Sequence, residues 1–343
     1  MTTNTPSNRA PKALVVGSFV MDLIVSAPRF PNEGETVLGD DFNMAPGGKG
    51  LNQAVQMARL GLDVTMVGAV GQDMFGETML EAAREAGVDV SHVLRLEDVP
   101  SAIGNVQLEV SKDGQTKNRI IVVSGANMRT RPEDIAFLEE TITDYDIVLL
   151  QQEIPSEVNL AVARMAKRHG VPIMLNPAPS RPIDPELLHS LTIISPNEHE
   201  ARAVAGSSKT LDITGGPDQA LTTEEIRSIA AWLRAEGIPN LLVTLGERGA
   251  ILINEDSETE SPSVRLEHVA DPTAAGDSFI GAFSTAYVHK LDLEQALTFA
   301  NHCAALTVSK MGALTSLPTR DELLAFLEAE QVDAALINTV KGW

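Results

Sequence analysis

Short apolar runs recur along this 343-residue chain, and amphipathic stretches lie between them. The apolar runs include residues 13–17, 64–68, 147–150, 172–175, 191–194 and 241–245. Helical periodicity marks the intervening stretches, which include residues 51–60, 78–86, 157–169 and 223–236. Strands that are apolar throughout are typical of a parallel sheet covered by helices on both faces. The alternation therefore predicts a doubly wound, mostly parallel α/β sheet, in which ligands bind beyond the carboxyl ends of the strands.

Two segments, at about residues 22–44 and 101–124, depart from this alternation. In the second segment, apolar and polar residues alternate, and Lys112-Asp113-Gly114 supplies a turn. We expect these segments to form antiparallel strands in a small sheet outside the main one. The simplest function for such a sheet is that of a lid over a binding site. Such an edge sheet can also pair with its copy in a dimer. Residues 206–222 are expected to form a surface insertion.

The chain is strongly acidic, with a net charge of −21. This charge argues against a nucleic-acid surface and against binding to an anionic membrane. The single cysteine, Cys303, excludes an intrachain disulfide framework and suits the cytoplasm, and we expect it in the core. Residues 1–12 are polar and predict a loose tail rather than a signal peptide. We expect one domain over residues 13–330 and a C-terminal helix or tail over residues 331–343.

The segment Ala274-Ala275-Gly276-Asp277 precedes a long apolar helix. Small residues let backbone N–H groups approach an anion closely, and a helix N-terminus attracts negative charge. A carboxylate in this position is best used to accept a proton from a hydroxyl. An ordinary helix cap has a similar sequence. Together with the other motifs, however, the segment indicates phosphoryl transfer to an alcohol.

A second motif, residues 45–54, reads A-P-G-G-K-G-L-N-Q-A. Its glycines predict a tight turn with exposed backbone donors before a helix. Asn52 lies on the first helical turn, where its amide can bind hydroxyl groups. The spacing differs from that of a Walker phosphate loop, so we expect Lys49 to bind a polar substrate. A flexible loop that happens to contain a lysine is the alternative.

Further polar residues follow predicted strands. Asn197 and Glu200 are three residues apart on a predicted helix, so they share a face that can hold hydrated Mg²⁺ and a phosphate. An acidic, solvated helix start has a similar sequence. The Gly-flanked loop within residues 242–250 is typical of nucleotide-binding loops and also of hairpin turns. Glu153 and Asn176 each follow a buried strand and are expected at the same crevice. The histidines have no zinc-site spacing, so we predict no transition-metal ligands.

The motifs G-G-K-G-x-N-Q-A and D-x-x-A-A-G-D occur in this order, and their joint occurrence is specific. The chain resembles ribokinase-type members of the PfkB carbohydrate kinase family from about Ala13 to about Leu327. This resemblance implies ATP-dependent phosphorylation of a sugar hydroxyl, with Asp277 as general base. It also implies that the backbone N–H groups of Ala275, Gly276 and Asp277 stabilise the transferring γ-phosphate.

The same resemblance assigns the binding residues, with Mg²⁺ and an activating K⁺ as cofactors and a homodimer as the assembly. The sugar would be held by Asp22, Gly48, Lys49, Asn52 and Glu153. The nucleotide would be bordered by Asn197, Thr244, Leu245, Gly246, Glu247, Arg248, Gly249, Gly276 and Asn301. Glu200 would organise Mg²⁺ through water. The K⁺ ligands, several through backbone carbonyls, would come from Asp271, Thr273, Thr307, Lys310, Gly312 and Ser316.

One position departs from the pattern of the family. Ribokinases typically have an asparagine that touches the sugar where this chain has Val20, two residues before Asp22. Losing one hydroxyl contact costs on the order of 1 kcal/mol of discrimination. Phosphorylation of D-ribose to D-ribose 5-phosphate remains the first expectation, and deoxyribose, another pentose, fructose or a nucleoside stay open as acceptors. Asn301 stands where ribokinases often have histidine.

The sequence disfavours two other classes of function. A sugar- or nucleotide-binding regulator without catalysis is disfavoured by the complete motif around Asp277. A dehydrogenase is disfavoured because no G-x-G-x-x-G follows the first strand. The sequence therefore predicts a cytoplasmic, ATP-dependent sugar kinase.

Overall fold

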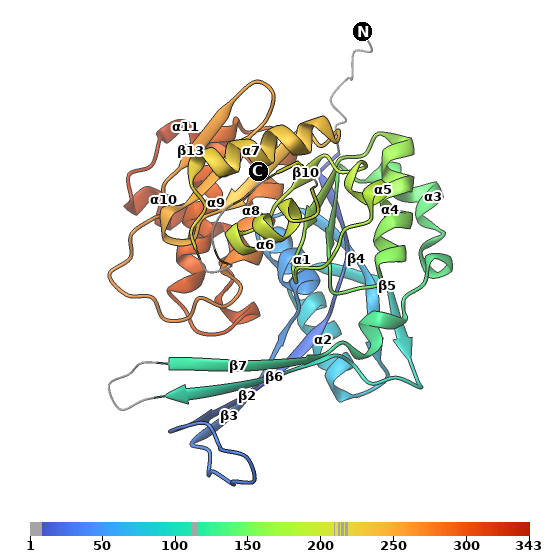
Figure 1. Cartoon of the computed structure of the whole chain (residues 1–343), viewed down its shortest axis with the longest axis vertical. Helices are drawn as coiled ribbons and strands as arrows, with labels where there is room; N and C mark the ends of the chain where they lie inside the picture. The colour runs from blue at the N-terminus through green and yellow to red at the C-terminus, as the bar shows by residue number, and fades with distance from the viewer. Residues whose placement is uncertain (1–8, 111–115, 209, 212, 214–215, 217–218) are drawn as a thin grey trace.

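A nine-stranded sheet forms the centre of the molecule in the computed structural model (Figure 1). The structure describes residues 9–110, 116–208, 210–211, 213, 216 and 219–343. The strands follow the order β13-β12-β11-β10-β9-β8-β1-β4-β5, and those from β11 to β5 are parallel. Their bounds are β1 Lys12–Val16, β4 Asp63–Gly71, β5 Val88–Leu96, β8 Ile147–Gln151, β9 Ile173–Asn176, β10 Ile193–Ile194, β11 Asn240–Thr244, β12 Ala250–Ile253 and β13 Glu258–Ser261.

Helices cover both faces of this sheet. One face carries α1 Lys49–Arg59, α2 Met74–Glu85, α8 Ala275–Val288, α9 Leu293–Val308, α10 Arg320–Ala329 and α11 Ala334–Lys341. The other face carries α3 Leu138–Thr141, α4 Ser156–His169, α5 Pro185–Leu188, α6 Glu198–Ala205 and α7 Thr223–Ala235. Short 3₁₀ turns are η1 Gly125–Arg129, η2 Pro132–Ile135, η3 Ile142–Asp144, η4 Gly246–Arg248 and η5 Leu314–Ser316.

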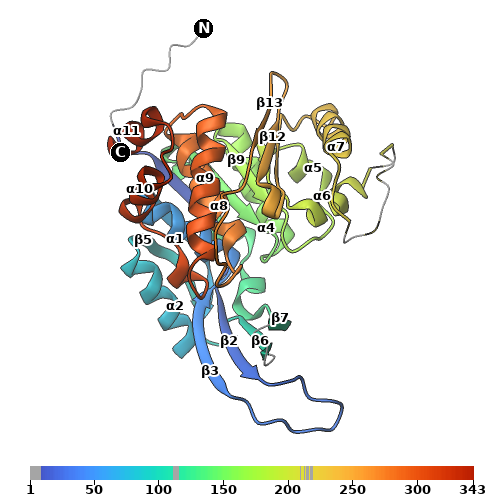
Figure 2. The same cartoon turned by 90° about the vertical axis from the view of Figure 1, so that its left-hand side faces the viewer.

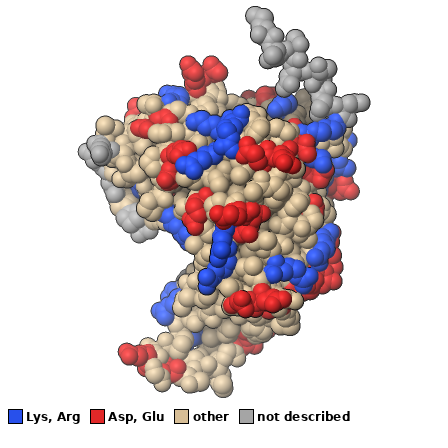
Figure 3. All heavy atoms as spheres, turned by 90° about the vertical axis from the view of Figure 1, so that its right-hand side faces the viewer, with Lys and Arg blue, Asp and Glu red and all other residues tan. Residues whose placement is uncertain are grey.

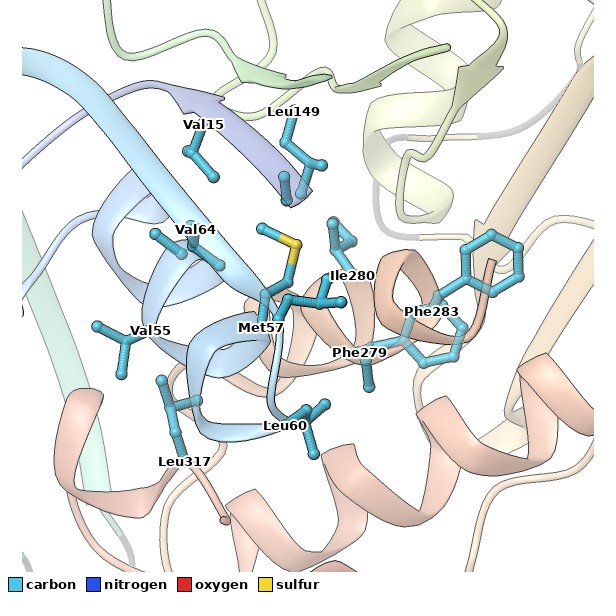
Figure 4. Close-up of a cluster of buried hydrophobic side chains, with 14 of the residues drawn as sticks. Val15, Val55, Met57, Leu60, Val64, Leu149, Phe279, Ile280, Phe283 and Leu317 are labelled. Atoms are coloured by element: carbon cyan, nitrogen blue, oxygen red, sulfur yellow. The ribbon is translucent and has the colours of Figure 1, made fainter. Parts of the chain in front are cut away.

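The apolar strands explain this layering, because their side chains alternate between two cores. Ala13 and Val15 of β1 belong to the core beneath α1 and α8, whereas Leu14 and Val16 belong to the core on the opposite face. All four residues are fully buried. Figure 4 shows the first core, where Val15 and Leu149 of the sheet face helical residues that include Met57 and Ile280. The predicted doubly wound α/β fold is confirmed.

The small sheet projects from one end of the molecule (Figure 2). Its strands are β2 Val20–Ala27, β3 Asp41–Gly47, β6 Ile103–Val110 and β7 Thr116–Val123, in the order β3-β2-β6-β7. The predicted small sheet is therefore present, but β2 and β6 pair in parallel rather than antiparallel. Both strands follow parallel strands of the main sheet, β1 and β5, and so leave it in the same direction. The predicted turn at Lys112-Asp113-Gly114 lies outside the described residues.

The C-terminal segment packs on the body rather than trailing from it. The region 293–327 contains α9 and α10 with a loop between them, and α11 follows within the C-terminal stretch 331–343 that was expected to be a helix or tail. The ring of Trp343 stacks on His289 with centroids 4.1 Å apart. Cys303 is buried in the core, as predicted. Among the described residues, no helix is long and apolar enough to span a membrane.

One close backbone approach sets the position of α1. A Cβ atom on Gly50 would lie 2.5 Å from the Ser18 nitrogen and 2.8 Å from the Gly17 carbonyl carbon. The first turn of α1 can therefore rest directly on the end of β1 only because residue 50 is a glycine. Gly48, just before this helix, has a φ of 99°, which also favours glycine. These glycines bring the first turn of α1 to the carboxyl ends of the strands.

Candidate active site

The N-terminus of α8 forms a backbone site for an anion. Ala274 adopts a left-handed conformation, with a φ of 61°, directly before the helix. A left-handed residue followed by helical residues turns successive N–H groups toward one point. The N–H of Ala275 donates to the Pro272 carbonyl at 3.3 Å. The N–H groups of Gly276 and Asp277 have no acceptor among the described residues, so they remain available to an anion.

The carboxylate of Asp277 is held by two neighbouring amides of α1. Asn52 Nδ2 donates to Asp277 Oδ2 at 2.9 Å, and Gln53 Nε2 donates to Asp277 Oδ1 at 3.0 Å. Asp277 is nearly buried, with 8% of its surface exposed. Asn52, which was expected to bind the sugar, therefore donates to the expected base. Gln53 was missed by the sequence analysis, although it is the residue after Asn52 in the same motif.

A cavity of about 210 Å³ opens in front of this carboxylate. Its lining includes Lys49, Asn176, Asn197, Glu200, Gly276 and Asp277. Burial alone would lower the pKa of the Lys49 ammonium, but Asp277, Glu153 and Glu200 together raise it above its usual value. Lys49 therefore stays cationic in the cavity. A fixed ammonium beside backbone N–H donors is a suitable environment for phosphoryl oxygens.

A second group of predicted residues gathers where the loop after β8 lies beside the connection from β1 to the small sheet. Glu153 accepts hydrogen bonds from the Ser18 hydroxyl and from the Lys49 backbone N–H. No described residue donates a hydrogen bond to the side chain of Asp22. Burial, followed by repulsion from Glu153, raises the pKa of Asp22 to about 6. A Cβ on Gly104 would lie 2.2 Å from Asp22 Oδ1, so β6 approaches Asp22 closely because it has a glycine there.

Val20 is the first residue of β2. It lies beside these carboxylates and is nearly buried. Its nitrogen is 2.7 Å from the position that a Cβ on Gly48 would occupy. Its Cγ1 is 3.7 Å from the corresponding position on Gly104. Val20 therefore places an apolar side chain among residues that are otherwise suited to binding hydroxyl groups.

A larger cavity of about 410 Å³ adjoins the first, and both are lined by Asn197, Thr244, Ala275 and Gly276. Its volume falls in the range of about 300–1,000 Å³ that is typical of small-molecule sites. Of the residues predicted to border the nucleotide, it brings together Asn197, Thr244, Gly246, Gly249, Gly276 and Asn301. It also contains residues that the sequence analysis missed, namely Glu198, His199, Phe279 and Ala304.

The remaining nucleotide candidates do not line either cavity. Leu245, Glu247 and Arg248 are absent from both linings. Arg248 instead pairs with Glu198 at 2.5 Å and donates to the Leu221 carbonyl. The carbonyl of Glu247 accepts a hydrogen bond from Ser263. These residues thus support the loop rather than facing the cavity.

Glu200 is the predicted magnesium residue, and it lies in the wall of the smaller cavity. Asn197 and Glu200 form a capping box at the start of α6, in which each side chain accepts from the other's backbone N–H. Burial raises the pKa of Glu200 despite the opposing effects of the Asn197 N–H and Lys49. One carboxylate in this position suits a cation that keeps its water shell. The described residues contain no group of three or more His, Cys, Asp or Glu side chains that could hold a metal.

The residues predicted to bind K⁺ come from two loops that the structure brings together, except Thr307, which belongs to α9. Asp271 accepts hydrogen bonds from the N–H groups of Thr273 and Gly312, at 2.9 and 3.0 Å. The Lys310 ammonium pairs with Glu322, and Ser316 donates to the Ala313 carbonyl. The hydroxyl of Thr307 lies in the core, bonded to Ser278 and to the Cys303 carbonyl. These side chains are therefore engaged with the protein, and a cation there would depend mainly on backbone carbonyls.

Comparison with known proteins gives the class of this arrangement. The model of the pfkB family carbohydrate kinases matches residues 10–320. The chain is 37% identical to a ribokinase of Lactococcus lactis, over 94% of this chain and 99% of the relative. It is 33% identical to a deoxyribokinase of Salmonella typhi, over 92% and 99% of the two chains. A solved structure of Arabidopsis thaliana ribokinase complexed with ribose and ATP superposes with a TM-score of 0.82 at 34% identity, covering 93% of this chain and 99% of that one.

The protein is thus a phosphotransferase of the ribokinase fold, in which a helix N-terminus borders two adjoining cavities and a carboxylate faces the smaller one. The chain belongs to the pfkB family of carbohydrate kinases.

The raised pKa of Asp22 allows a test of whether its ionised carboxylate destabilises the folded protein. Its pKa is about 6 in the folded protein, against an ordinary value of 3.8. Below about pH 4 it is protonated in both states. Between about pH 4 and pH 6 the unfolded chain releases the proton first, so the folded protein loses stability as pH rises. Asp22→Asn removes this loss, and its unfolding temperature should exceed that of the wild type increasingly up to about pH 7.

Thermal unfolding of both proteins from pH 4 to pH 8 measures this difference. Asp41→Asn, which changes an exposed carboxylate on the adjacent strand β3, is the matched control and should show little dependence. An Asp22→Asn difference that stays constant over this range would show that the carboxylate is not held in an unfavourable environment.

Proposed function

We propose that this protein is a ribokinase, which transfers the γ-phosphate of ATP to the 5-hydroxyl group of D-ribose. The observation that carries this proposal is the position of Asp277, where a carboxylate and free backbone N–H groups meet at the junction of two cavities. The larger cavity would take ATP, and the carboxylates near the small sheet would bind the sugar. The ribokinase relative and the solved complex with ribose and ATP support this assignment.

In the reaction, Asp277 accepts the proton of the sugar hydroxyl while its oxygen bonds to the γ-phosphorus. The bond from that phosphorus to the β,γ-bridging oxygen breaks, and ADP leaves with the bond's electron pair. The N–H groups of Gly276 and Asp277 stabilise charge on the phosphoryl oxygens, and the Lys49 ammonium adds to this stabilisation. The small sheet excludes water, which would otherwise hydrolyse ATP.

Asp277→Asn tests the role of the base. The amide keeps the size of the side chain but cannot accept the proton, so kcat should fall by at least about 100-fold. Circular dichroism and thermal unfolding should show that the fold remains. An ATP-consumption assay with ribose measures kcat, and turnover near that of the wild type would contradict the assignment. An inactive wild type that still binds ribose and ATP would instead favour a regulator.

The acceptor could also be 2-deoxyribose, and one observation favours it. Val20 places methyl groups among the carboxylates where ribokinases typically have asparagine, so the site offers one fewer partner for a hydroxyl. A deoxyribokinase is among the relatives. An unpaired hydroxyl against an apolar wall loses its hydrogen bond, whereas a sugar without that hydroxyl does not.

Val20→Asn should raise kcat/KM for ribose relative to deoxyribose by about 5- to 10-fold, as expected for one added hydrogen bond. Competition assays with both sugars measure the ratio, and Val25→Asn, on the exposed part of the same strand, is the control. An unchanged ratio in Val20→Asn would show that residue 20 does not select the sugar.

We propose that Mg²⁺ accompanies the nucleotide, with Glu200 acting through water. Its buried carboxylate in the wall of the cavity fits a hydrated ion. We also propose an activating K⁺ between the loops that contain Asp271 and Gly312, bound mainly by backbone carbonyls. When bound, Mg²⁺ would neutralise charge on the phosphoryl oxygens. A cytoplasmic location is our further proposal, and the lone buried Cys303 supports it.

We propose that two copies associate through the small sheet. Its outer strands, β3 and β7, leave unpaired edges, and exposed apolar side chains lie on the sheet. They include Phe42, Met44, Ile120, Ile121, Val122 and Val123. In the space-filling view, much of the projecting end carries uncharged atoms, whereas Lys, Arg, Asp and Glu mix over the body (Figure 3).

Sedimentation measures this assembly. The wild type should sediment as a species of twice the 36.6 kDa chain mass, and Ile121→Lys should shift it toward the monomer. A wild type that sediments only as a monomer at assay concentration would contradict the dimer.

A further inference from the structure

Behind Asp277, buried glutamine side chains form a row that the reaction described above does not use. Gln151, the last residue of β8, donates from Nε2 to Gln53 Oε1 at 2.7 Å. Gln53 then donates from its own Nε2 to Asp277 Oδ1 at 3.0 Å. Both glutamines are fully buried, with 0% of their surface exposed. The row therefore connects the central sheet to the base through α1.

The direction of these hydrogen bonds is fixed by the two ends of each amide. An amide has a donor end and an acceptor end. Because the N–H of Gln151 occupies Gln53 Oε1, the NH₂ group of Gln53 must face Asp277. The opposite orientation would place the Gln53 carbonyl oxygen against the carboxylate, which is repulsive. Gln151 therefore orients Gln53 from its acceptor end, and Asn176 Oδ1 accepts from Gln53 Nε2 at 3.4 Å at the donor end that meets the base.

Gln151 is itself held in place from two sides. The side-chain amide of Asn159 donates to its backbone carbonyl at 2.7 Å. Its Oε1 packs so closely against β1 that a Cβ on Gly17 would lie 2.1 Å from it. This oxygen is buried and has no hydrogen-bond partner among the described residues. An unpaired buried acceptor costs free energy, and such a group calls for an explanation.

An apolar side chain would fill the position of Gln151 without this cost. What the glutamine supplies, and an apolar residue would not, is the N–H that orients Gln53. The carboxylate plane of Asp277 is then fixed by Gln53 on one oxygen and by Asn52 on the other. Reactions between bound groups depend steeply on such alignment.

We propose that Gln53 and Gln151 are positioning residues, which together hold Asp277 in the orientation that receives the proton of the acceptor. This inference rests on the proposed function, since it assigns the base its geometry. Neither glutamine lies in the lining of the two cavities, so both act on the base from behind.

The first test compares Gln151→Met with Gln152→Met. These consecutive residues are both buried, but the Gln152 side chain faces carbonyls of residues 177–181 and does not contact the row. Gln151→Met should lower kcat by at least about 5-fold and leave the KM for the sugar within about 2-fold, because it disturbs alignment and not a sugar contact. Gln152→Met should keep kcat within about 2-fold of the wild type.

The second test is a double-mutant cycle on kcat. If Gln151 acts through Gln53, then Gln53→Met combined with Gln151→Met should be no slower than Gln53→Met alone. Independent structural roles would instead give multiplied losses. Thermal unfolding of every variant identifies any that fail to fold, and Gln151→Met alone remains decisive if Gln53→Met does not.

The outcomes distinguish a failure of the proposed function from a failure of the positioning role. A wild type without kinase activity toward ribose or deoxyribose would contradict the proposed function itself. With an active wild type, equal kcat values for Gln151→Met and Gln152→Met would overturn the positioning role. Multiplied losses in the double variant, or a rise in sugar KM in place of a fall in kcat, would overturn it as well.

Discussion

The contact between the first turn of α1 and the first turn of α8 is the interaction on which the site depends. Asn52 and Gln53 donate to the two carboxylate oxygens of Asp277, across 225 and 224 residues of sequence. This contact is possible because Gly50 lets α1 rest on the end of β1. Gly276 and Asp277 keep their N–H groups free because they open a helix. One contact therefore joins the two motifs and faces both toward one cavity.

The residues proposed to bind the sugar and those proposed to bind the nucleotide come from different parts of the chain. Asp22 lies on β2 and Glu153 lies in the loop after β8, and both are close to the loop after β1. Residues from β11, α6 and α9 surround the larger cavity. In a doubly wound sheet, the segments that follow parallel strands all begin at the same edge of the sheet. Segments that are distant in sequence therefore meet at that edge. The small sheet extends from the same end, which places it next to the residues proposed to bind the sugar.

Much of this arrangement could be predicted from sequence, because the signals are local. The alternation of apolar runs and amphipathic stretches gives the fold, and the Asp277 segment is recognisable when its small residues are read together with the other motifs. The parallel pairing of β2 with β6 has no local signal, since it depends on where the preceding strands end. The hydrogen bonds from the Asn52 and Gln53 amides to the Asp277 carboxylate are tertiary contacts, which have no local signal either. Similarly, Arg248 has the spacing of a nucleotide-loop residue, but it pairs with Glu198 and does not line either cavity.

Electrostatics support the proposal that the nucleotide enters this site together with a cation. The Lys49 ammonium interacts with the carboxylates of Glu153, Glu200 and Asp277, and Glu153 also repels Asp22. Burial raises the pKa of Asp22 and of Glu200, and repulsion from Glu153 and from Asp277, respectively, adds to this effect, so ionisation of these carboxylates is unfavourable. A polyphosphate that enters alone would add negative charge to this surplus, and the free N–H groups of one helix supply only about half a positive charge. A divalent ion beside Glu200 would reverse this balance, and the acidic site would then favour the ion–nucleotide complex over the free nucleotide.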